Sequence, residues 1–386
     1  MSNILIVGNS PAAISAIEHI RRTEVSSAIT LFCPEQVLPY DRCFLPSLVA
    51  KNIKESQVYV GHEKFFQEHK VNVMLNESLT RISAKRKQIT TANKTHVPFD
   101  KLLLTDLPAV QLPAVKGHHK KGIFNACRLS EVKDLVKQLP FIDNIIVPVA
   151  NFAGFDMACA LSRMGKEVAV AAPAGVLGGI FDDDTSALLK QMVEARGVRV
   201  FIDSVEELLG DAAVKAARLK SGKVIAAQAI VFDDVRPDVR LLEDSGLTDN
   251  GRIAVGEFFN TAAPDVFACD AALGAFDLLP QESARQGICA AANMLELGSM
   301  VYEPPTLLRE FGAKICDGFC GGSVRLQEGG REHMKFDGPR NIYKKIFVLN
   351  DGLVGAVWLN ALEDKDKVQQ ALAQKMPFND GLLLIP

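Results

Sequence analysis

The sequence predicts an α/β protein in which short buried strands alternate with amphipathic helices, and three observations support this prediction. Residues 4–7 are a short apolar run bounded by Gly8, which is typical of a buried strand in a parallel sheet. The residues that follow place apolar side chains on one helical face, namely Ala13, Ile14, Ile17 and Ile20. The same order of strand, turn and helix returns at residues 145–164. We therefore expect two units of one kind, the second inserted in the first.

The turn after the first strand, Gly8-Asn9-Ser10-Pro11-Ala12-Ala13, has the features of a dinucleotide site. A glycine lets the backbone turn sharply, small side chains let it approach a diphosphate, and the helix N-terminus offers free N–H groups and a positive dipole end. Compared with the fingerprint G-x-G-x-x-G/A, Ser10 replaces the second glycine and Ala13 takes the third place. An ordinary strand–helix turn of an α/β protein is the open alternative.

After the first helix we expect a second parallel strand at 29–32, a loop leading into a short helix at 37–46 and a helix at 64–69. A strand at 71–75, a β-meander at 79–100 and a further strand at 101–105 are expected to follow. An acidic residue at the end of the second strand would bind the adenosine ribose of a dinucleotide. Cys33 stands at that place, and Glu35 follows two residues later.

The second unit is expected to contain strands at 145–147, 168–171 and 198–202, with helices at 153–164 and 183–196. Further strands are expected at 226–232, 252–255 and 265–270, followed by a long helix at 280–295. Residues 301–305 are interpreted as a linker. The expected domains are residues 1–108 with 226–300, residues 109–225, and a small C-terminal α+β domain at 306–386.

Composition excludes several classes of function. The chain has 386 residues, 48% of them hydrophobic, which is enough for two or three domains. Its net charge of −3 provides no basic field for nucleic acid or an anionic membrane. No apolar stretch approaches the roughly 20 residues of a membrane span, and the N-terminus lacks a signal-peptide pattern. We expect a cytoplasmic protein with no nucleic-acid partner and no membrane insertion.

The eight cysteines are scattered among apolar neighbours, so most are expected to be small buried hydrophobes. Cys316 and Cys320 form a C-x-x-x-C pair without a second pair or a histidine nearby. This spacing does not support a metal site, and we expect none.

Together, several segments identify the chain as similar to the FAD-dependent pyridine nucleotide-disulfide oxidoreductases. Within that superfamily it resembles NADH:rubredoxin oxidoreductases and the flavin module of nitrite reductase large subunits. The segments are 4–21, 29–42, 99–108, 163–173, 188–200, 265–276 and 282–295. The resemblance implies a glutathione-reductase-like fold, with two Rossmann-like dinucleotide-binding domains, and FAD as cofactor.

Carried over residue by residue, the resemblance implies that the first fold holds the flavin. Glu35 would face the adenosine, Arg42 would lie beside the cofactor, and Asp270 would hydrogen-bond the ribityl chain, with Cys269 replacing the usual glycine before it. The helix after Gln281 would direct its N-terminus towards the isoalloxazine. The expected cofactor-binding residues are Gly8, Asn9, Ser10, Pro11, Ala12, Ala13, Glu35, Arg42, Asp270 and Gln281.

The nicotinamide site departs from the pattern of the resemblance. Where relatives carry G-x-G-x-x-G, this sequence has residues 149–154 with Val149 first, Asn151 third and only the last glycine, Gly154. A branched side chain at the first place hinders a tight turn against phosphates. Asp156 takes the place of a family glutamate, with an ordinary first-turn acid as the alternative. We expect the NAD(P)H site to be impaired.

Cys43 is a candidate catalytic thiol. In the branch of the superfamily that reduces coenzyme A disulfide or peroxide, a redox cysteine precedes Leu-Pro at the spacing seen here in Cys43-Phe44-Leu45-Pro46. A thiol beside a flavin and next to Arg42 could have a lowered pKa and exchange electrons. A coincidental match among eight cysteines is the alternative.

Three hypotheses remain open at this point. The first is an FAD-dependent oxidoreductase or electron-transfer subunit that passes electrons between FAD and a redox protein partner, either rubredoxin- or ferredoxin-like or a larger complex. The second is an NAD(P)H-dependent reductase of rubredoxin or another small carrier. The third is a non-catalytic scaffold subunit with structural FAD. A homodimer is compatible with each of them.

Overall fold

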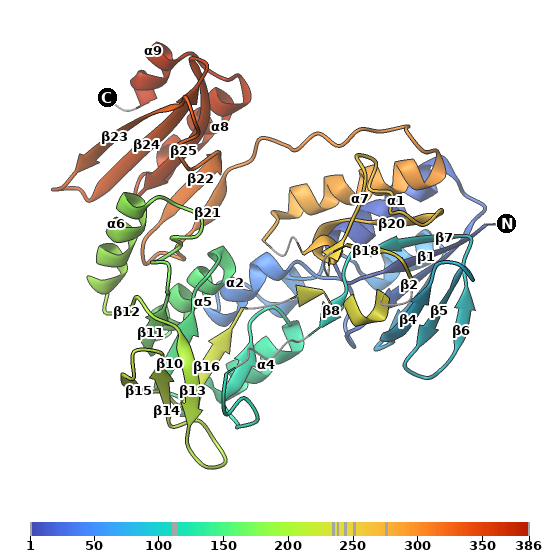
Figure 1. Ribbon diagram of the computed structural model, residues 1–386, viewed down its shortest axis with the longest axis horizontal. Helices are drawn as coiled ribbons and strands as arrows, with labels where there is room; N and C mark the ends of the chain where they lie inside the picture. The colour runs from blue at the N-terminus through green and yellow to red at the C-terminus, as the bar shows by residue number, and fades with distance from the viewer. Residues whose placement is uncertain are drawn as a thin grey trace. The chain divides into compact units, whose positions relative to one another are not determined.

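The computed structural model describes residues 2–109, 115–233, 236–237, 239–242, 245–249, 252–274 and 277–384 (Figure 1). Ala275 and Phe276, which end the segment 265–276 on which the resemblance partly rests, lie outside the described residues. The chain divides into two compact units. Unit 1 consists of Met1–Leu45, Ile53–Gln111 and Asp234–Pro305, and unit 2 consists of Pro46–Asn52, Leu112–Asp233 and Thr306–Pro386. The division into domains ending at 108, 225 and 300 remains a prediction.

Unit 1 is built on a five-stranded parallel sheet with the order β20-β7-β1-β2-β3. Its strands are β1 (Asn3–Val7), β2 (Ala28–Cys33), β3 (Val71–Leu75), β7 (Lys101–Leu104) and β20 (Val266–Ala268). Successive side chains of a strand point to opposite faces, so Ile4 and Ile6 pack on one side of the sheet and Leu5 and Val7 on the other. Both faces are buried, which is why these strands are apolar throughout.

Two helices cover one face of this sheet, α1 (Pro11–Thr23) and α7 (Pro280–Leu295), and they lie side by side (Figure 1). A Cβ on Gly287 of α7 would lie 2.2 Å from the carbonyl oxygen of Ala12. Only glycine allows this approach, and it brings α7 against the first turn of α1.

The other face of the sheet carries a meander, β4 (Leu79–Ser83), β5 (Gln88–Thr91) and β6 (His96–Pro98). Unit 1 also contains α3 (Glu63–Glu68), the short strands β8 (Pro108–Ala109), β17 (Arg236–Pro237), β18 (Thr248–Asp249) and β19 (Arg252–Ile253), and several short 3₁₀ helices. Helix α2 (Leu45–Val49) spans the sequence boundary between the units.

The first part of unit 2 has a second parallel sheet, with the order β12-β11-β10-β16-β9. Its strands are β9 (Ile123–Asn125), β10 (Asn144–Pro148), β11 (Glu167–Ala171), β12 (Arg199–Phe201) and β16 (Ala229–Phe232). The helices are α4 (Leu129–Gln138), α5 (Phe152–Arg163) and α6 (Asp183–Glu194). The pairing of β16 with β10 places residues 229–232 in this sheet.

One face of this second sheet packs on an antiparallel meander, β13 (Val205–Leu209), β14 (Ala216–Leu219) and β15 (Val224–Ala226). Neither the meander nor α4 is among the elements expected from the sequence. The strands of the meander are short and interrupted by charged residues such as Glu206 and Glu207, so their periodicity is weak.

The second part of unit 2 is an antiparallel five-stranded sheet with the order β21-β22-β25-β24-β23. Its strands are β21 (Arg309–Phe311), β22 (Gly318–Gly322), β23 (Arg331–Asp337), β24 (Ile342–Leu349) and β25 (Gly352–Leu359), and its helices are α8 (Lys365–Ala373) and α9 (Phe378–Gly381). The buried Trp358 lies in the core that this sheet forms with α8. The expected α/β fold with two parallel sheets of the dinucleotide-binding kind is confirmed.

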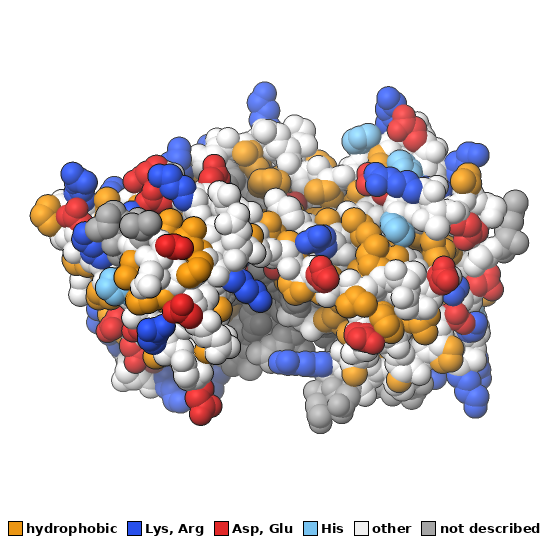
Figure 2. All heavy atoms as spheres, turned by 90° about the horizontal axis from the view of Figure 1, so that it is seen from above, with side chains coloured by type: hydrophobic (Ala, Val, Ile, Leu, Met, Phe, Trp, Pro, Cys, Tyr) orange, Lys and Arg blue, Asp and Glu red, His pale blue; other side chains and the backbone are white. Residues whose placement is uncertain are grey.

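The surface carries charges of both signs. On the face drawn in Figure 2, Lys and Arg side chains are interspersed with Asp and Glu, in keeping with the net charge of −3. Within the described part of the chain, no helix has both the length and the apolar character that crossing a membrane requires.

Candidate functional site

The fingerprint turn of unit 1 depends on Gly8. Its φ of +140° is one that L side chains rarely adopt, and a Cβ there would lie 2.1 Å from Thr105 Oγ1. The turn also closes on the sheet, because Gly8 N donates to Phe32 O at 3.0 Å. Thr105 and Asp106, at the end of β7, therefore form the support on which the turn rests.

The N-terminus of α1 is held by a chain of hydrogen bonds that the sequence did not indicate. Ala12 N donates to Ser283 Oγ at 3.1 Å, and Ser283 Oγ donates to Asp270 Oδ2 at 2.7 Å. All three residues are buried. The chain of hydrogen bonds joins the first turn of α1, the end of β20 and the start of α7, which are far apart in sequence.

Asp270 occupies an unusual backbone position, with a φ of +59°. Gln286 Oε1 accepts a hydrogen bond from its N–H at 2.7 Å. Burial raises the pKa of Asp270 to about 6, although the Ser283 hydroxyl and the charge of Arg42 oppose this shift. The side chain is therefore a carboxyl group that gains its charge near neutral pH.

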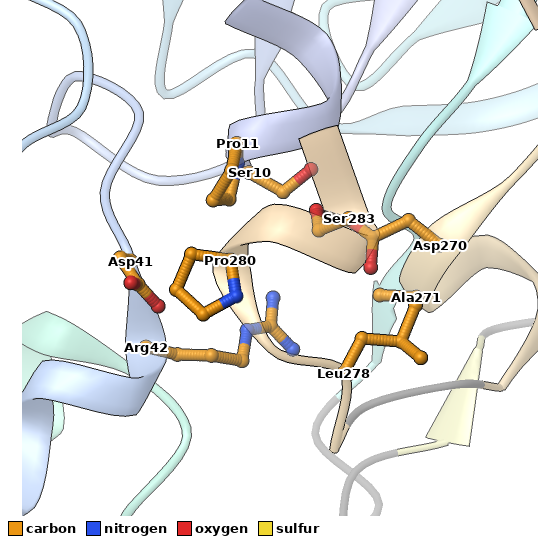
Figure 3. Close-up of a pocket in the computed structure, with 9 residues that line it drawn as sticks. All are labelled: Ser10, Pro11, Asp41, Arg42, Asp270, Ala271, Leu278, Pro280 and Ser283. Carbon is orange, nitrogen blue, oxygen red and sulfur yellow. Dashed lines mark hydrogen bonds between the residues drawn. The ribbon is translucent and has the colours of Figure 1, made fainter. Parts of the chain in front are cut away.

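Arg42 supplies a positive charge to the same pocket. Its Nη2 lies 2.6 Å from Asp106 Oδ2, and the carboxylate of Asp106 is 1% exposed. Figure 3 shows the Arg42 side chain reaching towards the start of α7, opposite Ser10 and Asp270. The cavity between these side chains has a volume of about 20 Å³, which is room for about one water molecule.

Asn9 gives independent evidence of a ligand at the turn. The residue is 2% exposed, and neither atom of its side-chain amide has a hydrogen-bond partner among the described residues. A buried polar group without a partner costs about 1–3 kcal/mol. A ligand with polar groups would remove that cost.

The acid expected near an adenosine, Glu35, is buried and accepts a hydrogen bond from Tyr40 Oη at 2.7 Å. Cys33, at the end of β2, is fully buried, and burial raises its thiol pKa to about 12. An open pocket of about 800 Å³ lies beside the ends of β2 and β3, lined in part by Gln36, Tyr59 and Leu75.

The structure brings together most of the predicted residues, but not all of them. Ser10, Pro11, Arg42 and Asp270 line one pocket, whereas the Gln281 side chain is exposed and is not part of that lining. Sequence reasoning missed Asp41, which also lines the pocket, and four further residues around it, Thr105, Asp106, Ser283 and Gln286. The segments 99–108 and 282–295 contained the signal, but the partners of these side chains are visible only in the fold.

All eight cysteines are described, and Cys43 differs from the other seven. The seven are buried, whereas Cys43 is partly exposed. It lies in the short 3₁₀ helix Arg42–Phe44, and its Sγ is 3.5 Å from the carbonyl oxygen of Leu278. Among the eight thiols, Cys43 is therefore the one that solvent can reach.

In unit 2 the corresponding turn is arranged differently. Val149 is buried, and its N–H donates to Ala171 O at 2.9 Å. Asn151 is the N-cap of α5, where its Oδ1 accepts from Gly154 N at 2.9 Å. The N-terminus of this helix is thus capped by the chain's own side chain, as in an ordinary helix.

Residues 2–288 match the family described as pyridine nucleotide-disulphide oxidoreductase. This chain belongs to that family. Family members are FAD-dependent, and a nitrite reductase [NAD(P)H] and rubredoxin-NAD(+) reductases are among the relatives of this chain.

Individual relatives show how far the likeness extends. The assimilatory nitrate reductase electron transfer subunit of Bacillus subtilis is 22% identical, over 96% of this chain and 49% of the relative. Subunit epsilon of the NADH-dependent phenylglyoxylate dehydrogenase of Aromatoleum evansii is 24% identical, over 96% and 91%. The structure of NADH:rubredoxin oxidoreductase from Clostridium acetobutylicum shares the fold, with a TM-score of 0.76 and 17% identity over 98% of this chain and 96% of that one.

The chain spans about half the length of the first of these relatives, and about half of the nitrite reductases of Bacillus subtilis and Escherichia coli that it also matches. The expected resemblance to rubredoxin reductases and to nitrite reductase large subunits is confirmed.

The Ser283 hydroxyl can be tested by its removal. Ser283→Ala leaves the Ala12 N–H and the Asp270 carboxyl each without one partner in a buried place, so the free energy of unfolding should fall by about 1–3 kcal/mol. Urea denaturation measures this change. Ser26→Ala, which alters an exposed serine, serves as the control and should change stability by less than about 0.5 kcal/mol. Equal effects of the two substitutions would contradict the role of Ser283.

The raised pKa of Asp270 predicts a pH dependence of stability. Between its ordinary value of 3.8 and about 6 the folded state binds this proton more tightly than the unfolded state. The contribution of Asp270 to the free energy of unfolding is therefore fully present at low pH and is lost as the pH rises through that window. At about 1.4 kcal/mol per pKa unit, the loss is on the order of 2–3 kcal/mol.

The control for this pH dependence is Asp270→Asn, which keeps the shape of the side chain and does not titrate. Relative to wild type, the variant should gain stability between about pH 4 and about pH 7. Urea denaturation across this range, with cofactor content measured for both proteins, checks the difference. Parallel pH profiles for the two proteins would show that Asp270 does not titrate in this way.

Proposed function

We propose that this chain is an FAD-binding electron-transfer flavoprotein that exchanges electrons with a protein partner and does not use NAD(P)H as its reductant. The observation that carries the proposal is the contrast between its two fingerprint turns. The turn at Gly8 keeps the glycine geometry, whereas the turn at Val149 ends in a helix capped by Asn151.

The residues around the first turn fit FAD. The small-residue turn and the start of α1 would receive the diphosphate, and the buried amide of Asn9 would gain a partner there. Glu35 would face the adenosine, and Asp270 the ribityl chain. FAD, when bound, would supply redox chemistry with one or two electrons.

The chain's own groups would set the charge around this cofactor. Arg42 is a permanent cation in the pocket wall, and α7 begins beside it at Pro280 with the positive end of its dipole. Both features favour negative charge on a bound group. Asp270 adds a negative charge to the pocket only when it is ionised. Its loss of a proton near pH 6 would therefore make the pocket less favourable for a negatively charged group.

Several relatives support a protein partner. One is an electron transfer subunit and another is the epsilon subunit of a larger dehydrogenase. A solved relative is a covalent complex of putidaredoxin reductase with putidaredoxin. We propose a redox protein as the partner here as well.

A second candidate function is an NAD(P)H-dependent reductase of rubredoxin or another small carrier, and the rubredoxin-NAD(+) reductases among the relatives favour it. A third is a scaffold subunit with structural FAD. The replacement of glycine by Cys269 beside Asp270 favours the scaffold.

Anaerobic reduction distinguishes the first function from the second. Purified protein loaded with FAD should keep its flavin absorbance when NADH or NADPH is added in excess, and lose it on addition of dithionite. Rapid bleaching by either nucleotide would overturn the proposal. A colourless protein that takes up no FAD, under conditions in which a flavoprotein of the family does, would overturn both functions and also the scaffold with structural FAD, and would leave a scaffold without a cofactor.

Cys43 remains the candidate catalytic thiol within this proposal, and its exposure can be tested directly. In native protein, iodoacetamide should modify Cys43 before the seven buried cysteines, because access limits the reaction. Mass spectrometry of the digested protein identifies the site, and Cys43→Ser is the control. A modified Cys43 that leaves turnover of every disulfide and protein acceptor unchanged would remove the thiol from the mechanism.

A further inference from the structure

Four phenylalanine rings fill the edge of the unit 2 sheet at which a dinucleotide would bind. Phe152 is the first residue of α5, and Phe181 lies between β11 and α6. The third ring, Phe155, is one turn into α5, and the fourth, Phe311, ends β21 of the C-terminal sheet. We call these four residues the Phe311 cluster. Their exposed fractions range from 0% to 7%.

Phe311 is the centre of this cluster. Its ring centroid lies 5.2 Å from that of Phe152, 5.7 Å from that of Phe181 and 6.2 Å from that of Phe155. Arg309, two residues earlier on β21, places its guanidinium carbon 4.8 Å from the centroid of the Phe152 ring. One short strand of the C-terminal sheet thus makes all of these contacts.

The backbone next to Phe311 is also fixed on α5. Gly312 N donates to Asp156 Oδ1 at 2.6 Å. Gly312 has a φ of +98°, and a Cβ there would lie 1.9 Å from the carbonyl oxygen of Cys316. The resemblance assigns Asp156 to the nicotinamide pocket. In this structure its carboxylate accepts a hydrogen bond from the chain's own backbone.

Arg325 attaches the C-terminal sheet to the loop that follows β11. Its guanidinium donates to the carbonyl oxygens of Ile180 at 3.0 Å and Phe181 at 2.9 Å, and also to that of Gly178. Three backbone carbonyls of this loop thus accept charge-assisted hydrogen bonds from one side chain of the C-terminal sheet.

Lys345 of β24 attaches the same sheet to α6. The residue is 1% exposed, and its ammonium lies 3.0 Å from Asp182 and 2.9 Å from Glu332. Asp182 is the N-cap of α6, so the ion pair links β24 to the start of that helix. Removing Asp182 would leave the buried Lys345 ammonium with one partner fewer, which is costly.

In open sheets of parallel strands, dinucleotides bind in the crevice outside the carboxyl ends of the strands, at the point where the strand order reverses. In unit 2 the order reverses at β10, which has β11 on one side and β16 on the other, and the elements that follow β10 and β11 carry Phe152 and Phe181. We propose that residues 309–312 occupy this crevice as a fixed plug and that Phe311 is the residue that excludes nicotinamide nucleotides from it. The inference rests on the proposed function and supplies a physical cause for the exclusion.

The test separates the plug from the altered fingerprint. Val149→Gly with Asn151→Gly restores the glycine pattern, and glycine is nearly as good an N-cap as asparagine. This double variant should still fail to bind NADH, because the plug remains. Adding Phe311→Ala should strengthen NADH binding at least about tenfold over the double variant. Titration with NADH, followed by its fluorescence, measures binding without requiring flavin reduction.

Two further variants keep the test decisive. Phe319→Ala, added to the double variant, removes a buried ring of the same sheet that stacks on Trp358 and lies outside the cluster, so it should not restore binding. Because Phe311→Ala removes a large core side chain and can impair folding, Phe311→Val in the same background is the milder replacement. Cooperative thermal unfolding and FAD content establish that each variant is folded.

Two results would overturn the inference. In the first, the double variant already binds NADH as tightly as the triple variant that also lacks Phe311. In the second, a folded triple variant, with either Ala or Val at 311, binds NADH as poorly as the double variant. Neither result affects the proposed function, which fails instead if NADH bleaches the flavin of the wild-type protein.

Discussion

Unit 1 depends on the buried hydrogen bonds that connect Ala12, Ser283 and Asp270. A helix N-terminus has donors that its own backbone cannot satisfy. In α1 one of these donors is satisfied by a hydroxyl from α7, and the same hydroxyl holds a buried carboxyl at the end of β20. The arrangement fixes three elements around one small pocket, and Arg42 and Asp106 complete its wall with an ion pair. The geometry proposed for a cofactor is thus supported by the chain's own hydrogen bonds and ion pair.

The two fingerprint turns show that one fold can be used in two ways. At Gly8 the backbone takes a conformation reserved for glycine and leaves a buried amide of Asn9 without a partner among the described residues. At Val149 the backbone is ordinary, and Asn151 caps the helix that a phosphate would otherwise approach. At the first turn a ligand could hydrogen-bond the buried amide of Asn9, whereas at the second the helix N-terminus already has a hydrogen-bond partner in Asn151. In unit 2 the C-terminal sheet is attached to elements of the parallel sheet by hydrogen bonds and an ion pair.

Local sequence patterns predicted the parallel sheets and the glycine turn at Gly8, because the apolar runs and the turn are signals contained in a few adjacent residues. Arg42 and Asp270 were found through the resemblance, and the fold brings both to one pocket. Ser283 and Gln286 were missed because their role depends on partners that lie far away in sequence. Phe311 was missed for the same reason, since β21 has only three residues and no pattern links it to α5. Gln281 was assigned from its position at a helix start, yet its side chain points to solvent.

The glycine contact between α7 and α1 also has a consequence for the order in which the protein can fold. Gly287 meets the backbone of Ala12, and β20 pairs with β7, so unit 1 gains its final strand and helix only after residue 295 has been synthesised. The parallel sheet of unit 2 lies within residues 123–232 and is made from one continuous segment. Domains of large proteins tend to fold as units while the chain is being made. Strand β1, which is synthesised before the other strands of its sheet, must therefore wait in an incomplete sheet until the chain behind it has formed α7.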